Sequence, residues 1–200
     1  MSTHRHDTWE LPAWAIEVVD EWDGSEADDE SRMQLVIDLA ACNVAEGTGG
    51  PFAAAVFDRY TGNLVAIGVN AVIPNGCSHA HAEMMAIARA QRALGTYDLG
   101  ADGLDHELVT SCEPCAMCFG AVPWSGIRRL VCGATDEDAR AIGFDEGDRP
   151  SNWQEALGSR GIEVVAGVCR AQARDVFQQY VDAGGEIYNS RQGQEPVEGS

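Results

Sequence analysis

The chain contains no lysine, and its 13 basic residues are all arginines, set against 32 acidic residues for a formal net charge of -19. The arginines do not gather in one segment, since the closest pairs are Arg89 with Arg92 and Arg128 with Arg129. A nucleic-acid backbone is repelled by such a field unless a basic groove is concentrated locally. The composition therefore argues against a nucleic-acid partner and favours a small, neutral substrate.

Long apolar runs are also missing. No stretch of about 18 apolar residues occurs, so we expect no membrane-spanning helix and no membrane partner. The N-terminal segment carries histidines and acids, where a signal peptide needs a basic start and an apolar run, and we therefore expect a cytoplasmic protein. Hydrophobic residues still make up 45% of the 200-residue chain, enough to bury the core of one ordinary domain.

The seven cysteines do not suggest a disulfide framework, because their number is odd and the chain is long for a disulfide-stapled secreted domain. Most of them lie in apolar runs, as Cys42 and Cys132 do, and are predicted to be small core residues. Cys115 and Cys118 have different neighbours and are treated below as candidate metal ligands.

Three regions are expected along the chain. Residues 1–30 form an acidic N-terminal extension, with a short helix expected over Leu11–Trp22. Residues 31–189 form the main domain, and residues 190–200 are a polar tail that we expect to be disordered.

Within the main domain, apolar residues alternate between helical and extended spacing. Ser31 is expected to cap the first helix. Apart from an initial hairpin the strands alternate with helices, which predicts an α/β fold of three layers, α/β/α, around a five-stranded mixed sheet. Strands are predicted over residues 52–58, 64–70, 107–110, 129–132 and 162–165, and helices over 31–46, 80–94, 115–122 and 170–183.

Two short motifs suggest a metal centre. His81-Ala82-Glu83 and Pro114-Cys115-Ala116-Met117-Cys118 each stand at the start of a predicted helix. Sulfurs three residues apart lie on one side of a helix, and the positive helix end favours the thiolate form that a metal needs. Two thiolates and one imidazole give a tetrahedral zinc three protein ligands and leave a fourth position for water, which is the catalytic pattern.

Glu83 is the candidate proton carrier beside this metal. Zinc lowers the pKa of a bound water to about 7, and the carboxylate two residues past His81 can reach the same pocket from a helix start. The pair of motifs is the signature of zinc nucleobase deaminases. A redox pair or half of a structural zinc site are the alternatives for the two cysteines, and His79 is the alternative ligand, although it would lose the His-x-Glu spacing.

With these residues the chain resembles the cytidine-deaminase-like superfamily, and within it the bacterial guanine deaminases. The resemblance covers residues 31–150 and extends more weakly to 189. The region between Gly147 and Gly167 departs from the family and leaves the identity of the base open. The matching stretches are Gly49-Gly50-Pro51-Phe52, Asn70, His81-Ala82-Glu83, Thr110 to Cys118, Gly120-Ala121-Val122-Pro123-Trp124 and Ala141-Ile142-Gly143-Phe144-Asp145.

The resemblance implies roles for further residues. Asn70 would hydrogen-bond the base, with Phe52 and Trp124 as walls of the pocket. Asp138 falls where the family keeps a second carboxylate that shuttles protons to the leaving amine, and Asp136 is the alternative for that role.

Contacts to the substrate are also implied for Ala82 and for Tyr188. In the family the end of the chain closes the active site of the partner subunit, and here residues 187–189 are the candidates for that closure.

The implied activity is zinc-dependent hydrolytic deamination of a free nucleobase, guanine to xanthine plus ammonia, by a homodimer with one Zn²⁺ per chain and a bound water or hydroxide. Cytosine-, nucleoside- and amino-triazine-type deaminases share the motifs and stay alternatives. A tRNA adenosine deaminase needs a basic docking surface that this composition does not favour, and a non-catalytic zinc module has no need of Glu83.

Overall fold

The computed structural model describes residues 10–24 and 28–189. The disorder predicted for residues 190–200 lies outside these ranges, as does the start of the acidic extension, residues 1–9. Among the helices within the described ranges, none combines the length and the apolar composition that crossing a bilayer requires.

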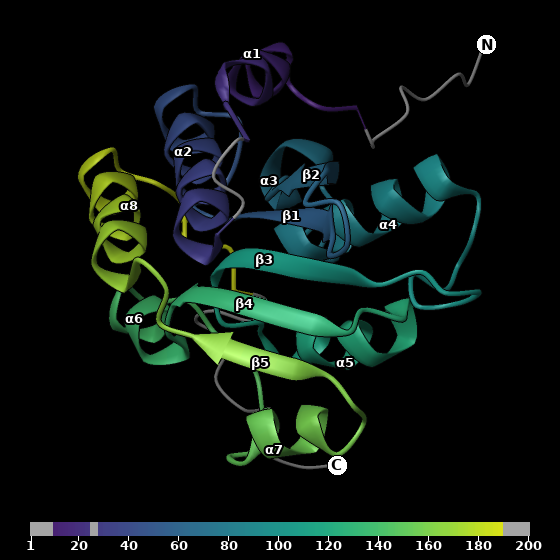
Figure 1. Ribbon diagram of the computed structural model, residues 1–200. Coiled ribbons are helices and arrows are strands. Elements are labelled where there is room, and N and C mark those ends of the chain that lie inside the picture. The colour runs from purple at the N-terminus through teal and green to yellow at the C-terminus, as the bar shows by residue number, and fades with distance from the viewer. Residues whose placement is uncertain (1–9, 25–27, 190–200) are drawn as a thin grey trace, which may run out of the picture.

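A five-stranded sheet in the order β2-β1-β3-β4-β5 lies at the centre of the molecule (Figure 1). β1 runs antiparallel to both β2 and β3, whereas β4 runs parallel to both of its neighbours, β3 and β5. The mixed sheet predicted from one hairpin and a series of strand–helix alternations is thereby confirmed. Its strands are β1 (Ala53–Asp58), β2 (Leu64–Val69), β3 (His106–Cys112), β4 (Arg129–Ala134) and β5 (Glu163–Ala166).

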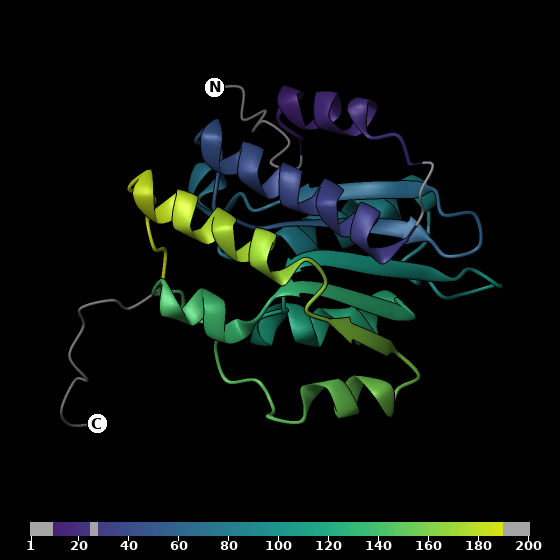
Figure 2. The same cartoon turned by 60° about the vertical axis from the view of Figure 1, so that its left-hand side comes forward.

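Helices cover both faces of this sheet, and the two views show them as separate layers (Figures 1 and 2). α2 (Asp29–Ala45) and α8 (Arg170–Asp182) pack on one face, and α4 (Ala82–Leu94) and α5 (Ala116–Ser125) lie on the other. α1 (Ala13–Glu21) packs outside α2. Three short helices do not appear among the sequence predictions, namely α3 (Val72–Asn75), α6 (Asp136–Ala141) and α7 (Trp153–Gly158).

The two faces of β1 belong to two different cores. Ala53, Ala55 and Phe57 point into the cluster under α2 and α8, whereas Ala54 and Val56 point into the cluster under α4 and α5. Successive side chains of a strand alternate between faces, so a strand covered on both sides is apolar throughout, as this one is.

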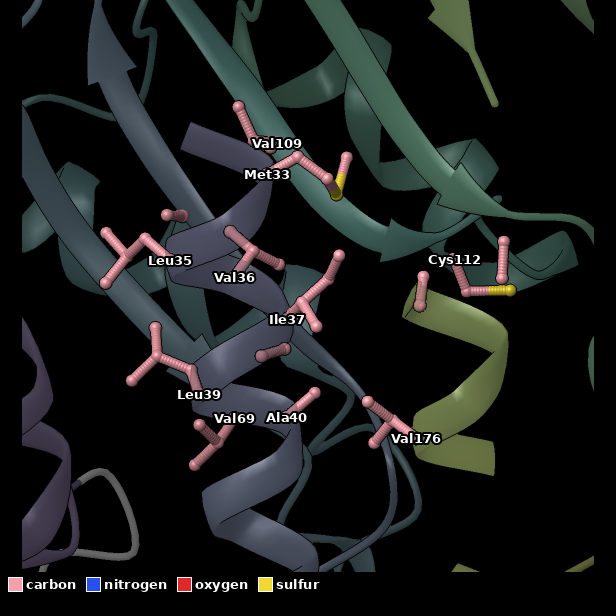
Figure 3. Packing of buried hydrophobic residues seen from close by; sticks show 14 of the residues in the cluster. Met33, Leu35, Val36, Ile37, Leu39, Ala40, Val69, Val109, Cys112 and Val176 are labelled. Carbon is pink, nitrogen blue, oxygen red and sulfur yellow. The ribbon is translucent and has the colours of Figure 1, made fainter. Parts of the chain in front are cut away.

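α2 contributes a large part of the first core. Figure 3 shows Met33, Val36 and Ala40 of this helix facing the sheet, with Val109 of β3 and Val176 of α8 as neighbours. Burial of each such large aliphatic side chain contributes about 1.5–3 kcal/mol, which fixes α2 to the sheet.

The N-terminus of α2 differs from the prediction, because Ser31 lies inside the helix. Asp28 is the N-cap, and its carboxylate accepts a hydrogen bond of 2.8 Å from the backbone N–H of Ser31. Aspartate is as good an N-cap as serine and also complements the positive end of the helix, which explains the earlier start.

The predicted N-terminal helix is present as α1 and is docked against the domain. Ala15 is buried, and Nε1 of Trp14 donates to Oγ1 of Thr48 at 3.2 Å. The ring of Trp22 meets that of Phe57 edge-on, with centroids 5.6 Å apart. The described part of the acidic extension thus packs Trp14 and Trp22 on the first core.

Candidate active site

The start of α4 lies close against the sheet because β2 carries a glycine where the helix crosses it. A Cβ at Gly68 would lie 2.3 Å from the carbonyl oxygen of Ala82 and 2.4 Å from the backbone nitrogen of Ala86. Only a residue without a side chain permits this approach. His81 is the N-cap of α4, so the same contact fixes the position of its imidazole.

The two cysteines follow the carboxyl end of β3, the strand that runs parallel to β4. Cys115 is the N-cap of α5, and Cys118 lies in the first turn of that helix. The sulfur of Cys115 is 3.5 Å from Nδ1 of His81, and the sulfur of Cys118 is 3.6 Å from the same nitrogen. The start of α4 and the start of α5 therefore meet at one point.

These three side chains fit a tetrahedral zinc. Zinc–sulfur and zinc–nitrogen bonds of about 2.3 and 2.0–2.1 Å at tetrahedral angles place sulfur and nitrogen about 3.6 Å apart, which is the spacing observed. Within the described part of the chain, His81, Cys115 and Cys118 form the group whose ligand atoms all lie within 4.8 Å of one another. The alternative ligand His79 is instead close to Cys77, with Nδ1 3.3 Å from that sulfur.

The electrostatics of the cysteine pair also suit a cation. The hydrogen bond with Cys118, and after it the neighbouring His81, lower the pKa of Cys115 to about 4. The same contact with Cys115, together with burial, holds the pKa of Cys118 well above its usual value. The two thiols are thus strongly coupled through one contact, and a metal that binds both sulfurs displaces their protons.

Glu83 lies in the first turn of α4, directly beside this group. Its side chain is buried, at 7% exposure, and burial together with the charge of Cys115 raises the pKa of Glu83 to about 7. Cys118 is also a close neighbour of the Glu83 carboxylate and acts to lower its pKa. The predicted meeting of His81, Glu83 and the two cysteines is therefore present in the structure.

A pocket of about 180 Å³ opens beside this group and is lined by His81, Glu83 and Cys115, whereas Cys118 is fully buried. Ligand sites for drug-sized molecules measure about 300–1,000 Å³, so this one has the size for a single small ring system. Its lining combines aromatic walls with polar groups from five separate segments. The lining residues are Phe52, Asn70, Val72, Ser78, His81, Glu83, Cys112, Glu113, Cys115, Phe144, Asp145, Glu146, Tyr188 and Asn189.

Asn70, Phe52 and Tyr188, predicted as substrate contacts, all line this pocket. The side-chain amide of Asn70 donates to the hydroxyl of Tyr188 at 2.8 Å, and its oxygen accepts from the backbone N–H of Gly50 at 3.4 Å. The rings of Phe52 and Phe144 meet edge-on with centroids 5.1 Å apart. Asn70 is thus oriented from both sides.

The last described residues lie over the pocket of their own chain. The side-chain amide of Asn189 donates to the carbonyl of Gly143 at 2.7 Å, and its oxygen accepts from the backbone N–H of Asp145 at 2.9 Å. Tyr188 packs on Phe144, with ring centroids 5.0 Å apart. In this structure Tyr188 and Asn189 therefore line the site of their own chain, and closure of a partner's site stays a prediction of the resemblance.

Four other residues considered for the site do not line this pocket. Trp124 is 86% exposed on α5 and borders a different surface groove, and Ala82 is fully buried behind the pocket. Asp138 forms the capping box of α6 with Thr135 and is held by Arg170, whose Nε lies 2.8 Å from it. Its alternative, Asp136, lines a separate polar groove. The structure brings none of these four into the pocket.

Glu146 is, besides Glu83, a buried carboxylate of the pocket, whose lining also includes the less buried Glu113 and Asp145, and the sequence reasoning missed it. It is buried, and burial together with the charges of Cys115 and Glu83 raises the pKa of Glu146 to about 8. Its backbone carbonyl accepts from the N–H of Ala116 at 2.9 Å. The signal was its position next to the Phe144-Asp145 stretch of the resemblance, since both of these residues line the pocket.

Comparison with known proteins finds similar sequences and solved structures among the guanine deaminases. The structure of the guanine deaminase from Nitrosomonas europaea is 49% identical, with a TM-score of 0.81 over 90% of this chain and 97% of that chain. A mutant protein solved in complex with 8-azaguanine is 48% identical, with a TM-score of 0.80 over 90% of this chain and 98% of that one. The guanine deaminase of Bacillus subtilis is 38% identical over 117 residues, which cover 58% of this chain and 71% of that protein.

Residues 26–134 match the family described as the cytidine and deoxycytidylate deaminase zinc-binding region. This match spans more than half of the chain and contains His81, Glu83, Cys115 and Cys118, whose geometry is that of a metal centre. The chain belongs to the cytidine and deoxycytidylate deaminase zinc-binding family.

Proposed function

We propose that this protein is a zinc-dependent aminohydrolase that converts guanine and water to xanthine and ammonia. The observation that carries the proposal is the convergence of His81, Cys115 and Cys118 beside Glu83, at a small pocket lined by His81, Glu83 and Cys115. The guanine deaminases among the similar proteins, and the 8-azaguanine complex, support guanine as the base.

His81, Cys115 and Cys118 would hold one Zn²⁺ per chain. When bound, the zinc supplies a water that is activated near neutral pH. Glu83 accepts the proton of the attacking water and delivers it to a ring nitrogen, as the carbon that bears the amine gains oxygen. The carbon–nitrogen bond then breaks, and a second proton reaches the departing amine.

For that second proton the pocket offers Glu146, because of the other lining carboxylates Glu113 is paired with Arg149 and Asp145 is exposed. Asp138, the residue implied by the resemblance, is separated from the pocket by its pairing with Arg170, whereas Glu146 lines the pocket together with Glu83. We therefore assign to Glu146 the protonation of the leaving amine.

The remaining lining residues would hold the base. Asn70 offers the hydrogen-bonding amide, and Phe52 and Phe144 supply aromatic walls. Trp124 has no place in this assignment because it faces solvent on α5, and a contact from Ala82 stays a prediction of the resemblance.

The site also bears on the alternatives. A pocket of about 180 Å³ suits a free base better than a nucleoside. The formal charge of -19 disfavours a tRNA substrate, and a purely structural zinc site does not need a buried carboxylate beside it. A cytoplasmic location stays a prediction of the sequence.

A panel of bases tests the proposal directly. Ammonia release is measured for the zinc-loaded protein with guanine, cytosine, ammeline, adenine, cytidine and guanosine, together with the zinc content per chain. We expect turnover of guanine and about one zinc per chain. Turnover of cytosine or cytidine in preference to guanine, or protein that binds no zinc, would overturn the assignment.

We also propose that the protein is a homodimer that pairs through the outer face of α5. This helix is apolar on every side, which is typical of a helix buried all round, yet Met117 and Trp124, seven residues apart on one face, are exposed. Tryptophan is a common anchor residue of interfaces, and Tyr97 borders the same groove.

Sedimentation of Trp124→Gln tests this interface. We expect the wild-type protein at twice the 21.4 kDa chain mass and the variant shifted toward the monomer. Tyr60→Gln is the matched control, because Tyr60 is an aromatic residue of similar exposure on the turn between β1 and β2. A wild-type monomer, or equal dissociation of both variants, would contradict the proposed interface.

A further inference from the structure

The segment between α6 and α7 carries Glu146 into the pocket without being part of a helix or strand. Its backbone touches the metal-ligand turn at one point, where the N–H of Ala116 donates to the carbonyl of Glu146 at 2.9 Å. Other contacts hold the neighbours of Glu146, Asp145 through Asn189 and Gly147 through Arg140, but neither reaches the metal-ligand turn. A second attachment to that turn would fix the direction of the carboxylate relative to the cysteines.

Arg149 makes that second attachment. Its Nη1 donates to the carbonyl of Pro114 at 2.8 Å, and its Nη2 donates to the carboxylate of Glu113 at 2.9 Å. Both acceptors belong to the two residues that precede the metal ligand Cys115. The guanidinium group thus spans from the segment that carries Glu146 to the turn that presents the cysteine.

The surroundings of Arg149 are those of an anchored side chain. It is only 8% exposed, and its guanidinium carbon lies 4.2 Å from the centre of the buried ring of Trp153. The same oxygen of Glu113 that it contacts also accepts from the backbone N–H of Asp136 at 3.2 Å. We call the contact of Arg149 with Glu113 and Pro114 the clamp. It joins the cysteine turn to the start of α6, through Asp136, and to the start of α7, through Trp153.

A second arginine also contacts the segment but is held differently. Nη2 of Arg140 donates to the carbonyl of Gly147 at 2.7 Å, while the side chain is 43% exposed and paired with Asp136 in its own helix. Exposed ion pairs of this kind restrain the chain only weakly, whereas a buried, bidentate guanidinium fixes both the distance and the relative orientation of the segments that it joins.

We propose that Arg149 is a positioning residue for deamination, which holds the Glu146 carboxylate in fixed register with the metal-ligand turn. The inference rests on the proposed function, in which Glu146 protonates the leaving amine. Arginine suits this task because its planar fork satisfies two acceptors at once while its face stacks on an aromatic ring, and lysine can do only part of this.

A double-mutant cycle with zinc-loaded, full-length protein tests the proposal. The rate constant kcat and KM for guanine are measured for wild type, Arg149→Gln, Glu146→Gln and the double variant, with zinc content determined for each. We expect Arg149→Gln to lower kcat by about 10- to 100-fold with little change in KM or zinc content. In the Glu146→Gln background the same substitution should lower kcat almost no further, because the effects of residues that act as a unit do not add.

Two further variants separate positioning from general damage. Arg149→Lys should recover part of the lost kcat, because one of the two acceptors can still be reached. Arg170→Gln is the matched control, since it removes a cation from the same polar groove without touching residues 113–116, and it should keep the wild-type kcat.

A readout without turnover is hydrogen exchange at the backbone N–H of Ala116, which donates to Glu146. Exchange at this amide should be faster in Arg149→Gln than in wild type or Arg170→Gln. Losses of kcat that multiply in the double variant, unchanged kcat in Arg149→Gln, or unchanged exchange at Ala116 would each overturn the positioning role.

Failure of this inference is distinct from failure of the proposed function. If the wild-type protein releases no ammonia from guanine, the substrate assignment falls, and the cycle is run with the base that the protein does deaminate. The exchange measurement at Ala116 tests the clamp in either case.

Discussion

Glu83 is a buried carboxylate 7% exposed at the first turn of a helix, and its neighbours are the three metal ligands. Replacing it by glutamine keeps the shape of the side chain and removes its ability to carry a proton. We expect Glu83→Gln to lose at least the 10²- to 10⁴-fold that general acid–base catalysis contributes, and to keep its zinc. Ammonia release and metal analysis measure the two properties, and retained turnover would refute the assignment.

Asp138 has a structural task that gives a second prediction. The ion pair with Arg170, together with hydrogen bonds from Thr135, holds the pKa of Asp138 well below its usual 3.8. A lowered folded-state pKa contributes stability at pH values above the ordinary one, and this contribution is lost as the pH falls and the carboxylate is protonated. We expect Asp138→Asn to lower the free energy of unfolding by about 1 kcal/mol, the usual cost of a lost helix cap.

Urea unfolding of wild type and Asp138→Asn between pH 2 and pH 8 checks this. The difference between the two proteins should be constant above about pH 5 and shrink below the usual aspartate pKa of 3.8. Deaminase activity should persist in the variant at pH 7, because Asp138 lies outside the pocket. A loss of activity as large as that of Glu83→Gln would return the second proton transfer to Asp138.

The site was predictable where its parts are local in sequence. His81, Glu83, Cys115 and Cys118 stand at two helix starts, and the helix geometry alone brings each pair to one place. Glu146 was missed because it lies in an irregular segment whose position depends on contacts with the cysteine turn.

Trp124 shows the opposite difficulty. An aromatic residue in a wholly apolar helix is compatible with a pocket wall, a core position or an interface, and only the structure shows that it faces outward. The type of a single hydrophobic residue does not tell whether it faces the core, a pocket or the solvent when every side of the helix is apolar.

At the level of elements, the approach of β2 to α4 determines where the metal ligands meet. A methyl group at Gly68 would lie 2.3 Å from the carbonyl oxygen of Ala82 and 2.4 Å from the nitrogen of Ala86, which are backbone atoms that cannot turn aside. Gly68→Ala should therefore push α4 away from the sheet and shift His81. We expect a loss of at least the 1–3 kcal/mol typical of overpacking, together with weaker zinc binding.

Thermal unfolding and a zinc competition titration measure these two effects. Gly158→Ala is the control, because a Cβ at this position in α7 meets nothing within 4 Å. Equal behaviour of the two variants would show that the contact between β2 and α4 yields easily and does not set the metal geometry.

The elements that were predicted are those with enough length for their periodicity to be visible. The strands of the sheet and the helices α2, α4 and α8 fall within a few residues of their predicted ranges. α3, α6 and α7 have four to six residues, too few to show a helical repeat. α6 nevertheless carries a signal in its capping box, with Thr135 three residues before Asp138.

For the whole molecule, the excess of acidic residues determines how stability responds to the solution. Some charges are paired internally, as in the buried Glu107, which is held by Arg32 and by Arg129. With 32 acids against 13 arginines, however, acidic side chains are in large excess, and the net charge of -19 repels itself in the folded state.

Salt should therefore stabilise this protein. The Debye length falls from about 30 Å at 0.01 M to about 3 Å at 1 M salt, so repulsion between separated surface acids is removed while close, buried pairs are screened much less. We expect the melting temperature Tm to rise steadily with sodium chloride over this range, and to rise equally with choline chloride at the same ionic strength. Differential scanning calorimetry of the zinc-loaded protein measures it. A Tm that stays flat or falls would show that the acidic surface charges are already balanced within the fold, and a rise with sodium alone would point to a specific cation in place of screening.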